Sequence, residues 1–364
     1  MPAADAAAFR AEFPVLDRIA YLNTGSVGPV PSRGAAAARE RIDTELLEGR
    51  AGQSAWESLL DLTERLREGY TRMLGGDVDE VAVTRSTTDG CNAVIWALEL
   101  GEGDEVLTSD EEHPGLLAPL NQARRRRGIE VRVVPFDEIA SEIRPQTKLV
   151  ACSHVSWASG RVADFEALAA AEPMVLLDGA QGLGAVPVDV RAFGCDFYAA
   201  SGQKWLCGPN SSGCLWVRSE RLAELSTPWP IFESVVDPER ALESPMREDA
   251  HRFDSGVLAS HSAAWSLAAI ELFEEFGVGW MHERAASLAD RLADSLRERG
   301  FDVVPRGRST LVCWRDPDPP TTVERLAAQK LVVRHIPGAG VVRASVGAWT
   351  SEEELERLVE AVVR

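Results

Sequence analysis

The sequence predicts an α/β protein with a mostly parallel sheet, because buried strand patterns alternate with helical ones. Short apolar runs at residues 148–152, 174–177 and 197–200 are typical of strands that are covered on both faces. Residues 301–364 again alternate strand-like and helix-like segments. In an open α/β sheet, ligands bind at the carboxyl ends of the strands, so the turns after these runs are candidate sites.

The length of 364 residues indicates more than one core. A chain of this size usually divides into a large domain and a smaller one. We expect a large domain over residues 19–240 and a small α/β domain over residues 241–364. Residues 8–18 have an amphipathic pattern, and residues 1–18 are predicted to be a lead-in that packs with the small domain.

The elements of the large domain follow from its hydrophobic pattern. Residues 19–22 are predicted to form a short strand that breaks into a Gly-rich turn, and residues 34–74 have the mixed charged faces of long helices. Hydroxyl side chains at 86–88 can cap a helix over 91–100. The arginines at 124–127, followed by a glycine, favour the end of a helix. Further strands are expected at 80–85, 104–108 and 213–217, and residues 219–255 have the composition of loops.

The small domain is predicted to begin with two long helices. The first covers residues 260–276, and the second covers 280–300 and ends with Arg297, Arg299 and Gly300, which is a C-terminal signature. The other expected elements are strands at 301–304, 310–314, 332–333 and 341–346, and helices at 321–330 and 351–363.

Composition disfavours several classes of protein. The formal net charge is -19, which disfavours nucleic acid as a partner because the phosphate backbone is also anionic. No run approaches the roughly 20 apolar residues of a membrane helix, and residues 1–16 lack the apolar core of a signal peptide. The six cysteines form no Cys-x-x-Cys pair, so we expect reduced thiols in a cytoplasmic protein and no metal site.

A lysine follows the apolar run at 197–200. Lys204 comes after Ser-Gly-Gln and shortly before a Gly-Pro turn. Close to the end of a buried strand the ammonium group of Lys204 is poorly solvated, so its pKa should fall towards the range where the amine is free. A free amine is what a lysine needs to form a Schiff base. The alternative is a surface lysine in a turn.

An acid ends the preceding strand pattern. Asp178 directly follows the run at 174–177. Pyridoxal phosphate needs a carboxylate against its ring nitrogen and a lysine for covalent attachment, and both would come from strand ends in an open sheet. The alternative is that Asp178 only caps a turn or helix. Together, Asp178 and Lys204 predict a pyridoxal phosphate site.

These two strand ends resemble motifs of the class V aminotransferases, in the branch of cysteine desulfurases and cysteine or cystine C–S lyases. Residues 177–181, Leu-Asp-Gly-Ala-Gln181, look like that family's Asp-x-x-Gln element, and residues 201–204 look like its Ser-Gly-His-Lys element. The resemblance extends over nearly the whole chain. It implies a fold-type-I enzyme with a seven-stranded-type sheet, and a homodimer whose active site the second subunit completes. It also implies that Lys204 holds the cofactor and takes the proton at the substrate Cα, with Asp178 at the ring nitrogen.

The resemblance implies that the cofactor phosphate lies at a helix start, at Thr87 and Thr88. Hydroxyls and free backbone N–H groups in the first turn of a helix favour an anion, although plain capping gives the same pattern. Ser201 and Gln203 alternate at a neighbouring strand end and can face the same phosphate. The family usually has a histidine where Gln203 stands. Glutamine can donate a hydrogen bond but carries no charge.

Two aromatic side chains are assigned to the cofactor ring by the same resemblance. His113, in a Glu-His element, is expected to stack on the ring and to act as an acid or base near neutral pH. Trp157 stands where many relatives have an asparagine that binds the cofactor's 3′ oxygen. Because Trp157 offers only its indole N–H, Ser156 and Gln181 are alternative partners for that oxygen.

The substrate side of the site is predicted from two further segments. The family has a Leu-Asn-x-Gly segment that lines the pocket, which implies roles for Asn23 and Gly25. Arg343, in Val-Arg-Ala-Ser, would bind the carboxylate of an amino-acid substrate in a bidentate pair; the alternative is a surface arginine on an edge strand. Relatives also carry a Gly-Thr pair that reaches the partner subunit's phosphate, where this chain has Gly256 and Val257, so only backbone around Gly256 could serve.

Two further sequence features favour a C–S lyase that eliminates sulfur from a cysteine-derived substrate and gives pyruvate and ammonia. Residues 205–209, Trp-Leu-Cys-Gly-Pro, resemble the form found in cystine lyases. Residues 333–342, where the nearest desulfurases carry a mobile cysteine, contain none. Desulfuration, transamination and epimerisation use the same cofactor and stay open, as does a catalytically silent binding protein, although the presence of Lys204 and Asp178 argues against the last.

Overall fold

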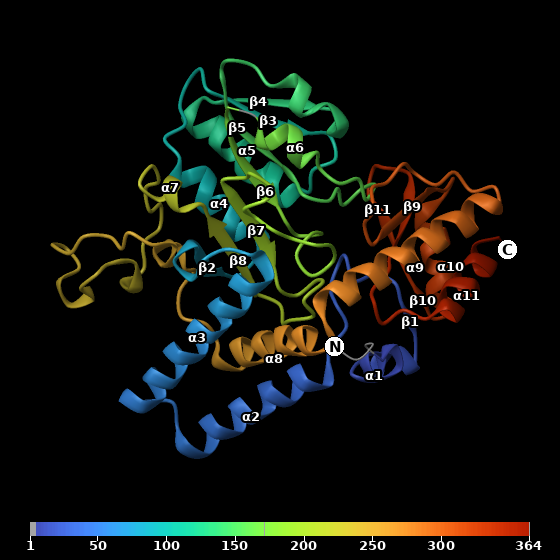
Figure 1. Cartoon of the computed structure of the whole chain (residues 1–364), viewed down its shortest axis with the longest axis horizontal. Helices are drawn as coiled ribbons and strands as arrows, with labels where there is room; N and C mark the ends of the chain where they lie inside the picture. The colour runs from blue at the N-terminus through green and yellow to red at the C-terminus, as the bar shows by residue number, and fades with distance from the viewer. Residues whose placement is uncertain (1–4, 171, 364) are drawn as a thin grey trace.

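The computed structural model describes residues 5–170 and 172–363 (Figure 1). Its largest element is a seven-stranded sheet in the order β2-β8-β7-β6-β5-β3-β4. Four neighbouring pairs are parallel, and only the pairs made by β8 are antiparallel. The predicted α/β class with a mostly parallel sheet is therefore confirmed. The strands are β2 (Val81–Thr84), β3 (Glu105–Ser109), β4 (Glu130–Val134), β5 (Thr147–Ser153), β6 (Met174–Asp178), β7 (Phe197–Ser201) and β8 (Gly213–Val217).

Helices cover both faces of this sheet, which is why its central strands are continuously apolar. Successive residues of β7 alternate between two cores: Tyr198 packs into the core on one face, and Ala199 packs into the core on the other. A Cβ atom on Gly90 would lie 2.8 Å from the Cβ of Ala199, so glycine allows the helix after β2 to approach β7 closely. The covering helices are α3 (Gln53–Leu74), α4 (Thr87–Ala97), α5 (Pro114–Arg127), α6 (Phe165–Ala169) and α8 (Ser260–Phe276).

A second body contains a three-stranded antiparallel sheet in the order β11-β12-β9, drawn in red in Figure 1. A two-stranded parallel pair, β1 with β10, joins the start of the chain to this body. Its strands are β9 (Leu311–Arg315), β10 (Leu331–Val332), β11 (Arg334–Ile336) and β12 (Val341–Ser345), with β1 (Ala20–Tyr21). Its helices are α9 (Val278–Glu298), α10 (Pro319–Ala328) and α11 (Glu352–Val363).

The lead-in contacts both bodies. In α1 (Ala6–Ala11), the Phe9 ring packs edge-on against Phe273 of α8, and Arg10 forms an ion pair with Glu354 of α11. Helix α2 (Ser32–Glu48) packs along α8, as does α3. Because α8 lies against helices of the large body, the predicted boundary near residue 240 stays a prediction.

Several expected elements differ from the structure. Residues 301–304 form no strand; only an isolated bridge joins Val303 to Trp314. Two strands were not expected: β4, a sheet edge whose pattern carries exposed and charged residues, and β11, which is only three residues long. Residues 219–255 are mostly loops, with α7 (Ser219–Leu222) at their start. Among the described residues, no helix is both long and apolar enough to cross a membrane.

Candidate active site

A cavity of about 240 Å³ lies at the carboxyl ends of β6 and β7, the edge at which open α/β sheets bind ligands. Its walls come from the large body, from the turn after β1 and from β11, so segments far apart in the sequence meet there. The lining residues are Gly25, Ser26, Ser86, Thr87, Thr88, His113, Trp157, Asp178, Ala180, Gln181, Ser201, Gln203, Lys204 and Arg334.

Lys204 is partly buried in the wall of this cavity, three residues after β7 ends. Burial lowers the pKa of its ammonium group to about 8; Asp178 acts in the opposite direction, and Arg343 and Arg334 lower the pKa further. The predicted direction of the shift is therefore confirmed. The loop after β1 passes directly over this turn, because a Cβ on Gly28 would lie 2.1 Å from the carbonyl oxygen of Lys204.

Asp178 is the last residue of β6 and its carboxyl group is buried. Oδ1 accepts a hydrogen bond of 2.9 Å from the backbone N–H of Ala180. Burial raises the pKa of Asp178, while the ammonium group of Lys204 and the Ala180 N–H lower it. Asp178 and Lys204 both line the cavity, and no salt bridge joins them among the described residues.

Hydroxyl groups line one end of the cavity at the start of α4. Ser86 is the N-cap, and its side chain accepts from the N–H of Asp89. Thr87 Oγ1 donates to Ser201 Oγ over 3.1 Å, which joins the helix start to the end of β7. The side-chain oxygen of Gln203 is buried there without a hydrogen-bond partner. This end has the donors and the helix N-terminus that suit an anion.

His113 lies in the cavity wall as the N-cap of α5. Its Nδ1 accepts a hydrogen bond of 2.9 Å from Gly115, and its ring meets Trp157 edge-on at 4.8 Å. Burial, followed by the positive charges of Lys204 and two arginines, lowers the pKa of His113 to about 4. The imidazole is therefore neutral at pH 7 in this structure, and the expected acid or base role of His113 stays a prediction.

Trp157 is held in the cavity wall by its loop. Glu111 accepts hydrogen bonds from the hydroxyls of Ser156 and Ser159 on either side of it, and Arg161 binds the same carboxylate at 2.8 Å. Ser156 is thus engaged with Glu111 and does not line the cavity, so it is not the alternative partner proposed for the 3′ oxygen.

Gln181 lines the cavity, but both ends of its amide are already bound. Nε2 donates to the Gly25 carbonyl over 2.8 Å, and Oε1 accepts from the indole N–H of Trp205 over 2.9 Å. These bonds tie the loop after β1 to the turn that carries Lys204. A role for Gln181 at the 3′ oxygen stays a prediction, and it would require one of these bonds to be shared or exchanged.

Three polar groups converge on Gly25. A Cβ there would lie 2.8 to 2.9 Å from Gln181 Oε1, Arg343 Nη2 and Ser345 Oγ, so only glycine fits. Arg343 is fully buried and donates to the Trp157 carbonyl over 2.9 Å, while its Nε and Nη2 have no partner. Burial lowers the pKa of Arg343 to about 10.

Three predicted residues do not line this cavity: Arg343, Asn23 and Gly256. Asn23 binds Ser26 through its side chain and bridges to the backbone of Ser345, so it shapes the loop that contains Gly25. Gly256 lines a different hollow, of about 550 Å³, between α3 and residues 232–258. Its predicted contact involves a second subunit, and that role stays a prediction.

Arg334 and Ser26 line the cavity but were not predicted. Arg334 donates from Nη1 to Ser26 Oγ over 3.0 Å, and its guanidinium lies over the Trp157 ring at 5.6 Å. A sequence signal did exist, because Arg334 and Arg343 flank a Gly-Ala-Gly turn at residues 338–340 that could close a hairpin.

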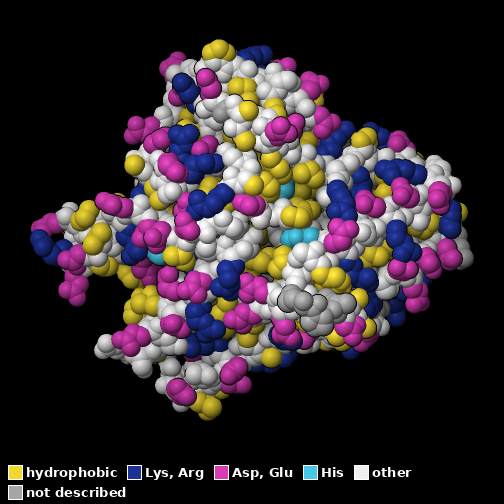
Figure 2. Space-filling model, viewed as in Figure 1, with side chains coloured by type: hydrophobic (Ala, Val, Ile, Leu, Met, Phe, Trp, Pro, Cys, Tyr) yellow, Lys and Arg dark blue, Asp and Glu magenta, His cyan; other side chains and the backbone are white. Residues whose placement is uncertain are grey.

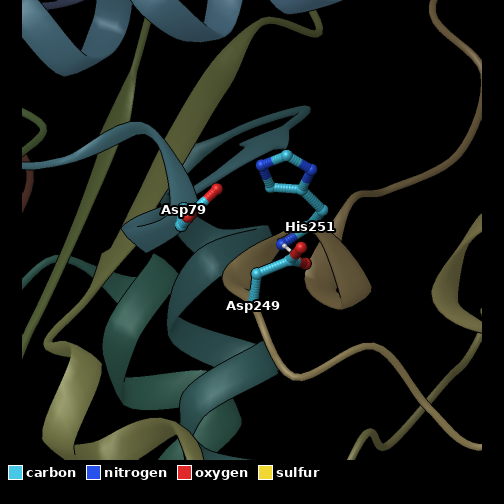
Figure 3. A group of neighbouring side chains, drawn as sticks. All are labelled: Asp79, Asp249 and His251. Carbon is cyan, nitrogen blue, oxygen red and sulfur yellow. Dashed lines mark hydrogen bonds between the residues drawn. The ribbon is translucent and has the colours of Figure 1, made fainter.

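A second group of acid and imidazole side chains, Asp79, Asp249 and His251, is drawn in Figure 3. None of the three lines the cavity. Asp249 binds Arg247 over 2.6 Å and accepts from the backbone N–H of His251. Asp79 is exposed beside them. The carboxylate of Asp249 therefore has an arginine partner and serves as a helix cap, which accounts for its position without a metal ion.

Charged side chains are mixed over the face of the molecule in Figure 2, and no extended basic patch appears on it. This agrees with the formal net charge of -19. A site for a small anionic ligand in this chain is therefore set by local groups inside the cavity rather than by an overall positive surface.

The sequence of this chain is similar to those of known proteins. A profile of the family described as Aminotransferase class-V matches residues 42–314. A cysteine desulfurase of Klebsiella pneumoniae is 30% identical over 79% of this chain and 76% of its own. An isopenicillin N epimerase of Streptomyces clavuligerus is 28% identical over 94% of both chains.

Solved structures extend the similarity to almost the whole chain. The cystine C–S lyase C-DES, in complex with its reaction product cysteine persulfide, has a TM-score of 0.90 and 26% identity over 96% of this chain and 99% of its own. A variant of C-DES with glycine covalently linked to its pyridoxal phosphate cofactor has a TM-score of 0.91 and 25% identity over 97% and 98%.

Proposed function

Because this chain belongs to the aminotransferase class-V family, we propose that it is a pyridoxal phosphate enzyme that cleaves the C–S bond of a cysteine-derived amino acid. The products would be pyruvate, ammonia and the thiol that carries the rest of the substrate. Similarity to a C–S lyase over 96% of the chain supports this reaction. Similarity to cysteine desulfurases and to an epimerase supports the cofactor and an amino-acid substrate more broadly.

Observations on the cavity support the cofactor. The hydroxyls and the helix N-terminus at the start of α4 suit a phosphate group. Lys204 and Asp178 both line the cavity. Gly25 leaves a small space in the cavity wall that the side chain of any other residue would fill. When bound, pyridoxal phosphate supplies a ring that draws electrons from the substrate Cα.

In this proposal each charged side chain has one task. Asp178 keeps the proton on the ring nitrogen, which a buried carboxylate can do because it is screened little by water. The free amine of Lys204 takes the proton from the substrate Cα. Arg343 would bind the α-carboxylate through Nε and Nη2, the two nitrogens that have no hydrogen-bond partner. His113 would lie against the cofactor ring as a neutral imidazole.

The observation that carries the choice of elimination over desulfuration is the state of the thiols. All six cysteines are buried and free. Burial raises the pKa of Cys313 to about 12 and that of Cys207 well above its usual range. A desulfurase needs a thiolate that can reach the substrate sulfur and accept it. Without such a group, the C–S bond breaks with its electron pair on sulfur, the thiol leaves, and water hydrolyses the remainder to pyruvate and ammonia.

A homodimer in a reducing compartment is part of the proposal. Apolar side chains are exposed along residues 229–246, which extend away from the body at the left of Figure 1 and would be covered by a second subunit. Leu242, Phe232 and Val236 are examples, with exposed fractions of 103%, 50% and 64%. Six unpaired cysteines fit a cytoplasmic protein.

The test is product analysis of the cofactor-loaded enzyme with cysteine, cystine and S-substituted cysteines. We expect pyruvate and ammonia in equal amounts. Stoichiometric alanine, with a persulfide trapped on a protein cysteine, would establish desulfuration instead. Formation of a D-amino acid would establish epimerisation, and a keto acid that retains the sulfur would establish transamination.

A further inference from the structure

A second buried carboxyl group lies close to Asp178 in the large sheet. Glu112 precedes His113, and its side chain is buried. Ser153, the last residue of β5, donates to it twice: the backbone N–H to Oε1 over 3.0 Å, and the hydroxyl to Oε2 over 2.6 Å. Ser109, the last residue of β3, donates to Oε1 over 2.5 Å. Glu112 therefore joins the turn that carries His113 to the ends of two strands.

Strand register places Glu112 and Asp178 on the same face of this sheet. Ser153 of β5 is paired with Asp178 of β6, and neighbouring strands lie roughly 5 Å apart. The residues two positions earlier, Ala151 and Leu176, pack into the core that α4 and α5 cover. Because side chains alternate between the two faces along a strand, Ser153 and Asp178 both face α4 and α5, and Glu112 is bound to the hydroxyl of Ser153.

The groups that bind Glu112 are neutral, and in residues 5–170 and 172–363 no basic side chain pairs with it. Burial raises the pKa of Glu112 to about 7; the serine donors act in the opposite direction, and the negative charge of Asp178 raises the pKa further. The other titratable groups beside it are the thiols of Cys91 in α4 and Cys152 in β5, which burial and both carboxyl groups keep neutral. Asp178 differs, because the positive charge of Lys204 acts on it.

We propose that Glu112 is a positioning residue that acts through Asp178: it carries a proton in the empty site and releases it to water when the cofactor binds. This inference rests on the proposed function, because it concerns the cofactor of that same site. In the empty site, two carboxylates on one face repel each other, which favours a proton on one of them. When Asp178 is paired with a protonated ring nitrogen, this repulsion falls, and Glu112 can ionise.

The hydrogen bonds of Glu112 suit both of these states. As a carboxylate, it accepts from the two serine hydroxyls and from one backbone N–H. As a neutral acid, it can donate from Oε2 to the Ser153 hydroxyl at 2.6 Å, because a hydroxyl group also accepts. Oε1 keeps its other two donors in either state. Glu112 can therefore gain or lose the proton without moving the turn that carries His113.

The experiment compares the wild type with Glu112→Gln, which keeps the size of the side chain but cannot ionise. Dissociation constants for pyridoxal phosphate are measured by absorbance titration of the full chain, freed of cofactor, at pH 5.5 and pH 8.5. At pH 5.5 Glu112 is protonated, so the two proteins should agree within about twofold. At pH 8.5 the wild type should bind about tenfold more tightly, the scale of one further charge roughly 10 Å away at an effective dielectric constant of about 20.

The comparison isolates Glu112 because titration of Lys204 and of the phosphate is common to both proteins and cancels in the ratio. Ser109→Ala is a second variant, which decides the question if Glu112→Gln does not fold as judged by circular dichroism. It removes a donor that favours the ionised acid. Its affinity for the cofactor should therefore be about threefold weaker than that of the wild type at pH 7, and little changed at pH 5.5 and 8.5.

A second measurement follows thermal unfolding without cofactor from pH 5 to pH 8. The folded chain holds the Glu112 proton up to about pH 7, whereas the unfolded chain releases it near the usual value of 4.5. The wild type therefore loses stability from this group as pH rises from about 5 to 7. Glu112→Gln lacks that loss, so its unfolding temperature should increase relative to the wild type over this range.

Glu105→Gln is the matched control for unfolding, because Glu105 is a buried acid that has a cationic partner. Burial alone would raise the pKa of Glu105, but bonds from Arg132, at 2.8 Å, and Thr147 lower it overall. Its stabilising effect is complete above about pH 5. The difference in unfolding temperature between Glu105→Gln and the wild type should therefore stay constant from pH 5 to pH 8.

A ratio of dissociation constants that is the same at both pH values would overturn the proposal, whatever its size, because a purely structural Glu112 gives a constant loss. An unfolding difference for Glu112→Gln that does not change with pH would also overturn it. The outcome is separable from that of the proposed function. Desulfuration or transamination in place of elimination would refute the lyase and leave both pH measurements as expected, whereas elimination with a constant ratio would do the reverse.

Discussion

Asp178 and Lys204 stand at the carboxyl ends of neighbouring parallel strands, and each shifts the pKa of the other towards its charged form. Burial acts against both charges. The positive charge of Lys204 lowers the pKa of Asp178, and the negative charge of Asp178 raises the pKa of Lys204. The net result is an amine whose pKa is about 8, close to the pH at which it would have to work.

We predict that the cofactor-free protein takes up pyridoxal phosphate with a pH midpoint near 8. The reaction needs the free amine of Lys204, and the free fraction rises as pH increases through the lowered pKa. An ordinary lysine would give a midpoint near 10.5. The rate of uptake is followed by absorbance, and Lys204→Ala is the control, in which borohydride should fix no pyridoxyl group to the 204 peptide. A rate that still increases steeply above pH 9 would contradict the prediction.

Asp178→Asn should lower the uptake midpoint further and suppress turnover. Loss of the carboxylate removes the one interaction that raises the pKa of Lys204, so the midpoint moves below pH 8. The protonated ring nitrogen also loses its partner, and turnover should fall roughly 100-fold, the scale of electrostatic stabilisation in a buried site. The uptake profile and kcat are measured on the same preparation. An upward shift of the midpoint, or near-wild-type kcat, would remove Asp178 from this role.

Residues at strand ends were predictable from the sequence because the signal is local. An apolar run followed by a polar residue placed Asp178 and Lys204 at one edge of the sheet, and the capping pattern placed Thr87 at a helix start. The class of fold followed from the same runs. These features depend on the chain within a few residues of each site, and tertiary structure did not alter them.

Features that depend on distant segments were not predictable in this way. Arg334 lies on a strand of three residues, and its place in the cavity wall depends on the pairing of β11 with β12. The pKa of His113 falls because burial and the charges of Lys204, Arg334 and Arg343 add up, and these groups come from three separate elements. Edge strand β4 escaped detection because its residues are not uniformly apolar.

Arg343→Ala should raise the KM of amino-acid substrates roughly ten- to a hundredfold and change kcat less. The change removes a charge-assisted pair with the α-carboxylate, which is formed on binding. A second measurement needs no variant: the wild type should bind an amino acid more tightly than its carboxamide. Arg343→Lys keeps the charge in the buried position, so its KM should lie between those of the wild type and Arg343→Ala. Equal KM values for the acid and the carboxamide would contradict the role.

The last prediction concerns Cys207, the thiol nearest to Lys204 in the sequence. Its side chain is buried, its φ is 55°, and burial raises its thiol pKa well above the usual range. A thiol in that state is neither ionised nor free to move, so it cannot accept sulfur from a substrate. Cys207→Ala should therefore keep pyruvate formation within about threefold and cost about 1 kcal/mol of stability for the lost packing.

Cys313→Ala is the matched control, because Cys313 is equally buried in β9 and burial likewise raises its pKa, to about 12. Both variants are assayed for pyruvate, alanine and trapped persulfide, and their thermal unfolding is compared with that of the wild type. If elimination is the reaction, the two variants behave alike in all three assays, since neither thiol takes part. Loss of product in Cys207→Ala alone, with its unfolding temperature little changed, would make Cys207 the sulfur acceptor and the chain a desulfurase.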